Sequence, residues 1–128
     1  MWFQETVSSY VSILNDCAYS LENHWKNAAH LIDDIKKSEA IEKALWSRTP
    51  QDMFEGMELE MLRYAEKLTL RPSAMVHEDV LALKKVGAGD GEILELNQIV
   101  GYFNYVNRLL NGLGVTTSGD TVGFYRAD

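Results

Sequence analysis

The chain is poor in cysteine, in basic residues and in long apolar runs, and each shortage argues against a class of protein. Its single cysteine, Cys17, cannot form an internal disulfide, which argues against a disulfide-stapled secreted domain and fits a reducing compartment. Lys and Arg number 12 against 19 Asp and Glu, for a net charge of −7, so the surface does not suit a grip on nucleic-acid phosphates. No uninterrupted apolar run approaches the ~20 residues of a membrane span. The start, Met1 to Glu5, has neither the basic residues nor the apolar stretch of a signal peptide. We expect a cytoplasmic protein with no membrane or nucleic-acid partner.

The helical spacing of apolar residues predicts an all-α fold. With 128 residues, of which 46% are hydrophobic, the chain is long enough for one domain with its own core, over residues 1–128. Turn residues divide the apolar pattern into segments. We expect a compact bundle of about six helices, followed by an extended tail at 113–128 whose Val122, Phe124 and Tyr125 can be buried on a neighbouring subunit. The expected helices are 2–14, 16–36, 38–46, 52–70, 76–86 and 91–111.

Capping and breaking residues set the expected boundaries. Ser38 is a suitable N-cap for the third helix and Asp90 for the last, while Gly112 is expected to end the last helix. Asn15 and Asp16 interrupt the first apolar run, and a helix that starts there places Cys17 in its first turn.

The stretch from Glu5 to His24 holds the candidate chemistry. Cys17, Ser20 and His24 are spaced i, i+3 and i+7, which places them on one face of a helix. The partial positive charge of a helix N-terminus favours a thiolate at Cys17. His24 can pair with that thiolate or move its proton, and Glu5 can orient the imidazole. The alternative is a buried core cysteine and a solvated first-turn glutamate.

Other kinds of site find little support. The three histidines are scattered and no H-x3-H or carboxylate pair completes a metal site, so we expect no metal. The segment GAGDGE follows a predicted helix instead of a strand, which argues against a dinucleotide cofactor. Asn104, Asn107 and Arg108 interrupt the apolar face of the last helix, where they either line a pocket or satisfy helix ends and subunit contacts.

The spacing Glu–x11–Cys–x2–Ser–x3–His, within YVSILNDCAYSLENHW, resembles the signature of the alkylhydroperoxidase D / carboxymuconolactone decarboxylase superfamily. It is most similar to the peroxidase-related branch, whose signature reads Glu–x11–Cys–x2–Cys–x3–His. Further blocks agree in order, namely LRYAEKLTLRPSAM, KKVGAGDGEILEL and VGYFNYVNRLLNGLGV, so the resemblance covers nearly the whole chain. It implies an AhpD-like helical domain without the family's usual N-terminal helices, assembled as a symmetric homo-oligomer. The apolar face of the first helix is then expected to be buried against later helices of the same chain or against a second subunit.

The resemblance also implies a role for each residue of the signature. Cys17 matches the first, resolving cysteine of a redox pair, His24 the histidine and Glu5 the proton-relay glutamate, while Ser20 stands where the peroxide-attacking cysteine is expected. The implied activity is thiol-dependent reduction of small-molecule hydroperoxides without a cofactor. If Ser20 is native, Cys17 itself has to react and an external thiol has to reduce it. If position 20 is natively a cysteine, that cysteine attacks and Cys17 resolves it as a disulfide. Three explanations of Ser20 remain open. It is an engineered Cys→Ser substitution, the native residue of a protein that works with one thiol, or the mark of a protein that lost the activity and kept the scaffold. The alternative is a lyase resembling carboxymuconolactone decarboxylase, in which the histidine acts without a thiol, or an inactive scaffold.

Overall fold

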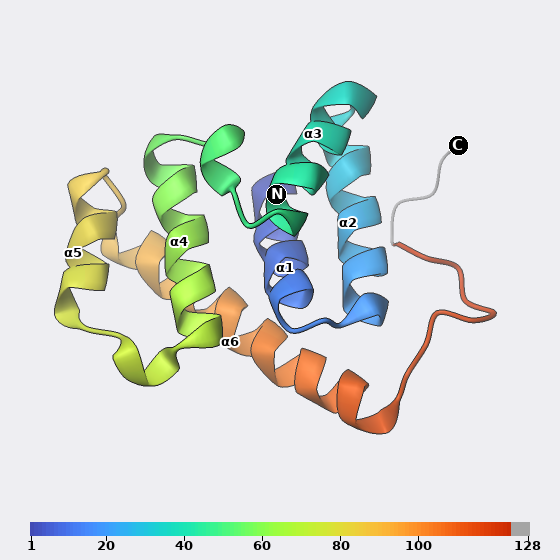
Figure 1. Cartoon of the computed structure of the whole chain (residues 1–128). Coiled ribbons are helices and arrows are strands. Elements are labelled where there is room, and N and C mark those ends of the chain that lie inside the picture. The colour runs from blue at the N-terminus through green and yellow to red at the C-terminus, as the bar shows by residue number, and fades with distance from the viewer. Residues whose placement is uncertain (124–128) are drawn as a thin grey trace.

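The computed structural model describes residues 1–123, which form six α-helices, two short 3-10 helices and no strand (Figure 1). The predicted all-α bundle is therefore confirmed. Within the same residues, no helix has both the length and the apolar character needed to cross a bilayer. The α-helices are α1 Trp2–Leu14, α2 Ala18–Ile32, α3 Ile35–Trp46, α4 Gly56–Leu70, α5 His77–Lys85 and α6 Asp90–Leu113, and the 3-10 helices are η1 Pro50–Asp52 and η2 Pro72–Ala74.

Helix α1 is the centre of the molecule. In Figure 1 it lies between α4 and the α2–α3 pair, and the long helix α6 crosses below them. Every side chain from Thr6 to Ser12 is buried. A helix covered on all sides is typical of the interior of a fold. The chain's own later helices therefore supply the cover that the sequence analysis required.

Small hydroxyl residues allow neighbouring helices to approach α1 closely. Thr6, Ser8, Ser9 and Ser12 each donate a hydrogen bond to the backbone carbonyl four residues earlier, at 2.7–3.0 Å. These bonds satisfy the buried hydroxyls of Thr6, Ser8 and Ser9 within α1, whereas Ser12 also contacts Ser20 of α2 and Asn107 of α6. The remaining buried positions of α1 are apolar. Val7, Tyr10 and Val11 join the hydrophobic core that also contains Ile41, Leu45, Leu62, Ala65, Leu83, Ile93, Leu96 and Val100.

The predicted second helix, 16–36, was wrong at its end. It stops at Ile32 because Asp33 adopts a left-handed backbone, with φ of +52°, which short polar residues tolerate better than most. Asp34 then starts α3, and its Oδ1 accepts a hydrogen bond from the backbone N–H of Lys37 at 3.0 Å. Ser38 is consequently not an N-cap. It is buried inside α3 and donates to the carbonyl of Ile35.

Three further boundaries differ from the prediction. Helix α4 begins at Gly56, whose φ of +58° turns the backbone into the helix, whereas Asp52 belongs to η1. The N-cap of helix α6 is Gly89 and not the expected Asp90, and the N–H of Gly89 donates to Glu92 at 3.1 Å. The same helix ends before Gly114, with φ of +66°, instead of at Gly112.

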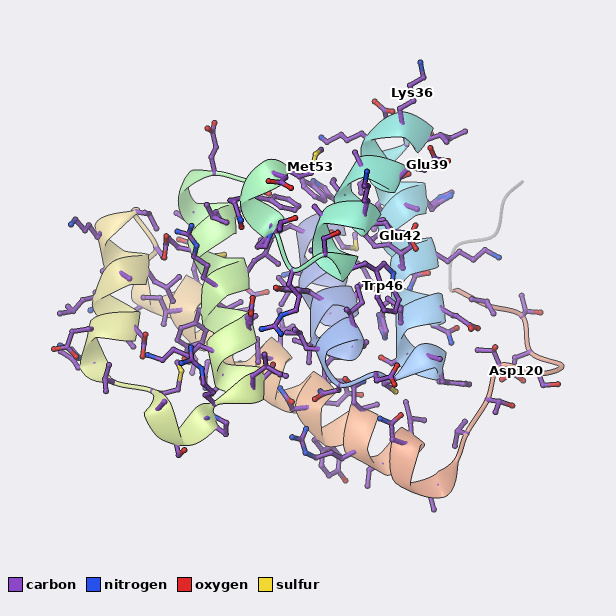
Figure 2. All side chains as sticks on the ribbon, in the orientation of Figure 1. Lys36, Glu39, Glu42, Trp46, Met53 and Asp120 are labelled. Atoms are coloured by element: carbon purple, nitrogen blue, oxygen red, sulfur yellow. The ribbon has the colours of Figure 1, made fainter. Side chains whose placement is uncertain are left out.

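The surface of α3 and the tail complete the described fold. Lys36, Glu39 and Glu42 follow one another along the outer side of α3, and Trp46 lies at its end (Figure 2). Residues 114–123 are not helical, and they loop outward before they come back to α2 (Figure 1). The hydroxyl of Thr117 donates to Glu22 at 2.5 Å and the N–H of Gly123 donates to Asn23 at 3.0 Å. This part of the predicted tail therefore contacts its own chain, whereas Phe124 and Tyr125 lie outside the described residues.

Candidate functional site

A short loop between α1 and α2 positions the candidate residues. Asp16 has a φ of +50°, which lets the chain reverse, and the N–H of Cys17 donates to the carbonyl of Ser12 at 2.8 Å. The carbonyl of Cys17 accepts the first bond of α2, from the N–H of Leu21 at 3.0 Å. Cys17 is therefore the N-cap residue of α2. The expectation that it occupies the first turn was wrong by one residue.

The α1–α2 hairpin brings Glu5 and His24 together. His24 Nδ1 lies 2.6 Å from Glu5 Oε2, although the two residues are 19 positions apart. Their side chains are 21% and 20% exposed, so solvent reaches the pair without surrounding it. Phe103 of α6 packs edge-to-face on the imidazole, with ring centroids 4.6 Å apart. The carboxylate and the phenyl ring together hold the orientation of the imidazole.

This pair can transfer a proton at the wall of a cavity. A neutral imidazole that donates Nδ1–H to Glu5 keeps its Nε2 lone pair for another proton. A carboxylate bound to a histidine in this way selects the tautomer and stabilises the imidazolium that forms. Glu5 and His24 line a cavity of about 320 Å³, which is large enough for a small organic molecule. The other lining residues are Met1, Gln4, Ser8, Glu95, Ile99 and Phe103.

The other two residues of the signature lie apart from this cavity. Cys17 is 1% exposed and Ser20 is 3% exposed, and neither side chain lines the cavity. The hydroxyl of Ser20 lies 2.9 Å from the hydroxyl of Ser12, so its polar partner is Ser12 and not His24. The hydroxyl of Ser20 thus has no base beside it that would make it a nucleophile. The predicted group divides into an acid–base pair at the cavity and two buried side chains that do not line it.

A group of asparagines, which the sequence analysis did not single out as a unit, joins the loop to α6. The Asn15 side-chain N–H groups donate to Asn104 Oδ1 at 3.0 Å and to Asn107 Oδ1 at 3.1 Å. Asn111 donates to the carbonyl of Asn15 at 3.0 Å. Positions 104, 107 and 111 share one helix face, and this spacing of polar residues in an apolar helix was the available signal. Of the two roles considered for Asn104 and Asn107, contacts at helix ends are observed. Asn104 and Arg108 also line a cavity of about 270 Å³.

A second paired carboxylate, Glu66 of α4, lies on the other side of α1. Its Oε2 accepts a hydrogen bond from the Tyr10 hydroxyl at 2.5 Å, and its Oε1 accepts from the guanidinium of Arg48. Burial, followed by the hydrogen bond to Glu66, raises the pKa of Tyr10 well above its ordinary value. Partial burial alone would raise the pKa of Glu66. The hydrogen bonds from Tyr10 and Arg48 outweigh that effect and hold the pKa below its ordinary value.

The remaining histidines do not extend the site. His30 and His77 are both exposed, on α2 and α5. Within residues 1–123, no three His, Cys, Asp or Glu side chains are grouped as ligands for a metal ion.

Comparisons with known proteins support the fold. No family model matches the sequence, and a search of curated proteins finds no match. The structure is similar to the crystal structure of an uncharacterized peroxidase-related protein from Silicibacter sp. TM1040, with a TM-score of 0.80 and 23% sequence identity. The match covers 90% of this chain and 58% of that chain, so this chain spans less than two thirds of its neighbour's length. The chain therefore shares the helical fold of a protein described as peroxidase-related.

Proposed function

We propose that the chain is a peroxidase-related oxidoreductase that reduces hydroperoxides through Cys17, with Glu5 and His24 as its proton relay. The 2.6 Å contact between Glu5 and His24 at a cavity wall is the observation that carries the proposal. The signature that resembles alkylhydroperoxidase D calls for this pair, and the pair depends on two residues from different helices. The fold shared with a peroxidase-related protein adds support.

The reaction balances with an external thiol as reductant. The Cys17 thiolate attacks the terminal oxygen of the hydroperoxide, so that an S–O bond forms, the O–O bond breaks and an alkoxide leaves. His24 gives a proton to the alkoxide, and Cys17 becomes a sulfenic acid. One external thiol then forms a mixed disulfide and releases water. A second external thiol frees Cys17 and leaves as a disulfide. Because Cys17 is 1% exposed, we expect the α1–α2 loop to open before attack.

The test is peroxide consumption by Cys17→Ala in the presence of a small dithiol. We expect turnover to be abolished, because the variant has no thiol. In the unaltered chain, dimedone should trap the sulfenic acid, and peptide mapping should place the adduct on Cys17. Mapping also separates this product from oxidation of the five methionines. Turnover that survives in Cys17→Ala would refute the proposal.

One observation favours a second candidate, a lyase that needs no thiol. Glu5 and His24 line the cavity, whereas Cys17 and Ser20 are buried and do not line it. In such an enzyme a carboxylated lactone loses carbon dioxide, and His24 returns a proton to the resulting carbanion. Alkylation of Cys17 should then leave lactone turnover unchanged, and His24→Ala should abolish it. His77→Ala, at an exposed histidine, is the matched control.

A further inference from the structure

A second cavity lies along α4 and is lined mostly by charged side chains. Its volume is about 390 Å³, which is large enough for a small organic molecule. Most of the lining residues belong to α4, which lies between α1 and α5 in Figure 1. Different residues line the cavity of Glu5 and His24, so the two cavities are distinct sites.

This cavity carries a positive charge in an acidic protein. Its cations are Arg48, Arg63, Lys67 and Arg71. Its carboxylates are Glu60, Glu66 and Asp79. The pKa of Glu66 is lowered as described above, and hydrogen bonds from Lys67 lower the pKa of Asp79, so both carboxylates are charged at neutral pH. The cavity therefore has one positive charge in excess, whereas the whole chain has a net charge of −7.

The carboxylates of the cavity are already engaged by its cations. Both oxygens of Glu66 accept hydrogen bonds, as described above. Both oxygens of Asp79 accept from the ammonium of Lys67, at 2.8 Å each. One oxygen of Glu60 accepts from Arg63 at 2.7 Å. The acidic side chains thus offer little to a cationic ligand.

Within residues 1–123, the cations keep unused N–H groups. A guanidinium has five N–H donors in a planar fork. Arg48 donates through Nε and Nη2 and Arg63 through Nη1, which leaves donors on both side chains. In the same part of the chain, the side chain of Arg71 forms neither a hydrogen bond nor an ion pair. Its charge still reaches Asp79, whose pKa is lowered first by the bond from Lys67 and to a smaller extent by Arg71.

The backbone fixes the positions of Arg71 and Arg48. The N–H of Arg71 donates to the carbonyl of Lys67 at 2.8 Å, and Pro72 disfavours a helical conformation at Arg71, where α4 ends. Arg48 follows α3 with a φ of +55°, a left-handed conformation that glycine usually adopts at this place. Its bond to Glu66 ties the side chain to α4. A site whose groups are already in place loses less free energy when it binds a ligand.

We propose that this cavity is a binding site for a small organic oxyanion, a carboxylate or a phosphate, which Arg71 contacts directly. An oxyanion supplies acceptors for the unused N–H groups, and arginine binds such groups through paired hydrogen bonds. Leu70, which is 41% exposed, and Tyr64 give the body of the ligand an apolar surface. The inference goes beyond the proposed function and does not depend on it, because the site contains no residue of the signature.

The test is a titration of the full chain with phenyl phosphate and with benzoate, followed by the NMR shifts of the backbone amides. In about 0.15 M salt, which screens weak surface attraction, we expect saturable binding with a Kd of about 1 mM for one of the two anions. The tighter anion identifies the preferred group. The shifts should concentrate on residues 63–71. Benzyl alcohol, which has a similar ring and no charge, should not bind.

Arg71→Gln is the variant that tests the contact. It should weaken binding about tenfold, the loss expected for a hydrogen bond to a charged group. The fold should persist, because the Arg71 side chain forms no hydrogen bond within the described residues, and thermal unfolding checks this. Arg108→Gln is the matched control. It removes the same charge from an exposed position of α6, where Arg108 bonds to Asn104, and should leave the Kd unchanged.

Three results would overturn the inference. The first is the absence of saturable binding of either anion up to about 10 mM. The second is binding of benzyl alcohol as tight as that of the anions. The third is an affinity of Arg71→Gln no weaker than that of Arg108→Gln, which would mean that the net charge of the chain and not this cavity governs the binding. The titration uses neither peroxide nor reductant, so its outcome is separate from that of the proposed function.

Discussion

Helix α1 takes part in two carboxylate contacts that use similar chemistry for different ends. On one side Glu5 of α1 meets His24, and on the other side Tyr10 of α1 meets Glu66. Both carboxylates are partly buried, and both join α1 to another helix. The two contacts differ in how many partners the carboxylate has and in what lies beside it.

Glu66 is fully engaged, whereas Glu5 is not. Both oxygens of Glu66 are bonded, one to the Tyr10 hydroxyl and one to Arg48, whose positive charge compensates the carboxylate. Burial and the hydrogen bond to Glu66 raise the pKa of Tyr10, so its hydroxyl keeps its proton near neutral pH. The side chain of Glu5 has His24 as its hydrogen-bonded partner, and His24 faces a cavity. A carboxylate whose two oxygens are both bonded, such as Glu66, holds two helices together. A carboxylate–histidine pair in which the second imidazole nitrogen can reach the cavity is able to exchange protons with a substrate.

The largest expected effect separates the two carboxylates by activity. Glu5→Gln should lower the rate of peroxide consumption about 100-fold, because the neutral amide no longer stabilises the imidazolium of His24. Glu66→Gln, the same change on the other side of α1, should leave that rate unchanged. The measurement is steady-state peroxide consumption with a dithiol reductant. Equal losses in the two variants would mean that the two carboxylates are not functionally distinct.

A smaller effect is expected on stability. Tyr10→Phe removes the hydroxyl that bonds to Glu66 and should lower the free energy of unfolding by about 1.5 kcal/mol, within the range for a hydrogen bond to a charged group. Tyr102→Phe, at a tyrosine that is 59% exposed, should change it by less than about 0.5 kcal/mol. Urea denaturation measures both. If Tyr10→Phe were as stable as the control, Glu66 would not be a structural contact.

The smallest effect concerns acid stability. The pKa of Glu66 is lower in the folded chain than its ordinary value of 4.5, so its charge stabilises the fold above about pH 4.5. That stabilisation is lost as the pH falls through the lower, folded-state pKa. Glutamine does not ionise. Between about pH 6 and about pH 3, the free energy of unfolding should therefore fall less in Glu66→Gln than in the unaltered chain, by up to about 1 kcal/mol.

Glu39→Gln is the control for acid stability, since Glu39 is exposed on the outer side of α3 (Figure 2). Its stability should fall with acid as in the unaltered chain. A Glu66→Gln variant that behaved like this control would show that the charge of Glu66 adds nothing to the acid dependence.

Local patterns predicted the fold class well and the element ends less well. The 3.6-residue period of apolar side chains depends on local geometry, so six helices could be placed from it. The break between α2 and α3 was predicted at residue 37 instead of at Asp33 and Asp34, because these two aspartates read equally well as the polar face of one helix. Only the left-handed backbone of Asp33 separates the two, and an aspartate permits that conformation without requiring it.

The candidate site, like the fold, was predicted only in part from local patterns. Spacing along one helix and the resemblance to a family pointed to Glu5, Cys17, Ser20 and His24. Neither could show that Ser20 bonds to Ser12, since that contact depends on how closely α1 and α2 pack. The pairing of Glu66 with Tyr10 links residues 56 positions apart and has no local signal.

The amino-acid sequence by itself determined the all-α class, the acidic surface, the limit of a single thiol and the candidate signature, because these follow from composition and from periodicity within single segments. Only the tertiary structure decided that His24 meets Glu5, that Cys17 and Ser20 are buried, and that asparagines of α6 hold the loop before Cys17. The physical reason is that burial and hydrogen-bond partners depend on which helices touch, and segments distant in the chain settle that together.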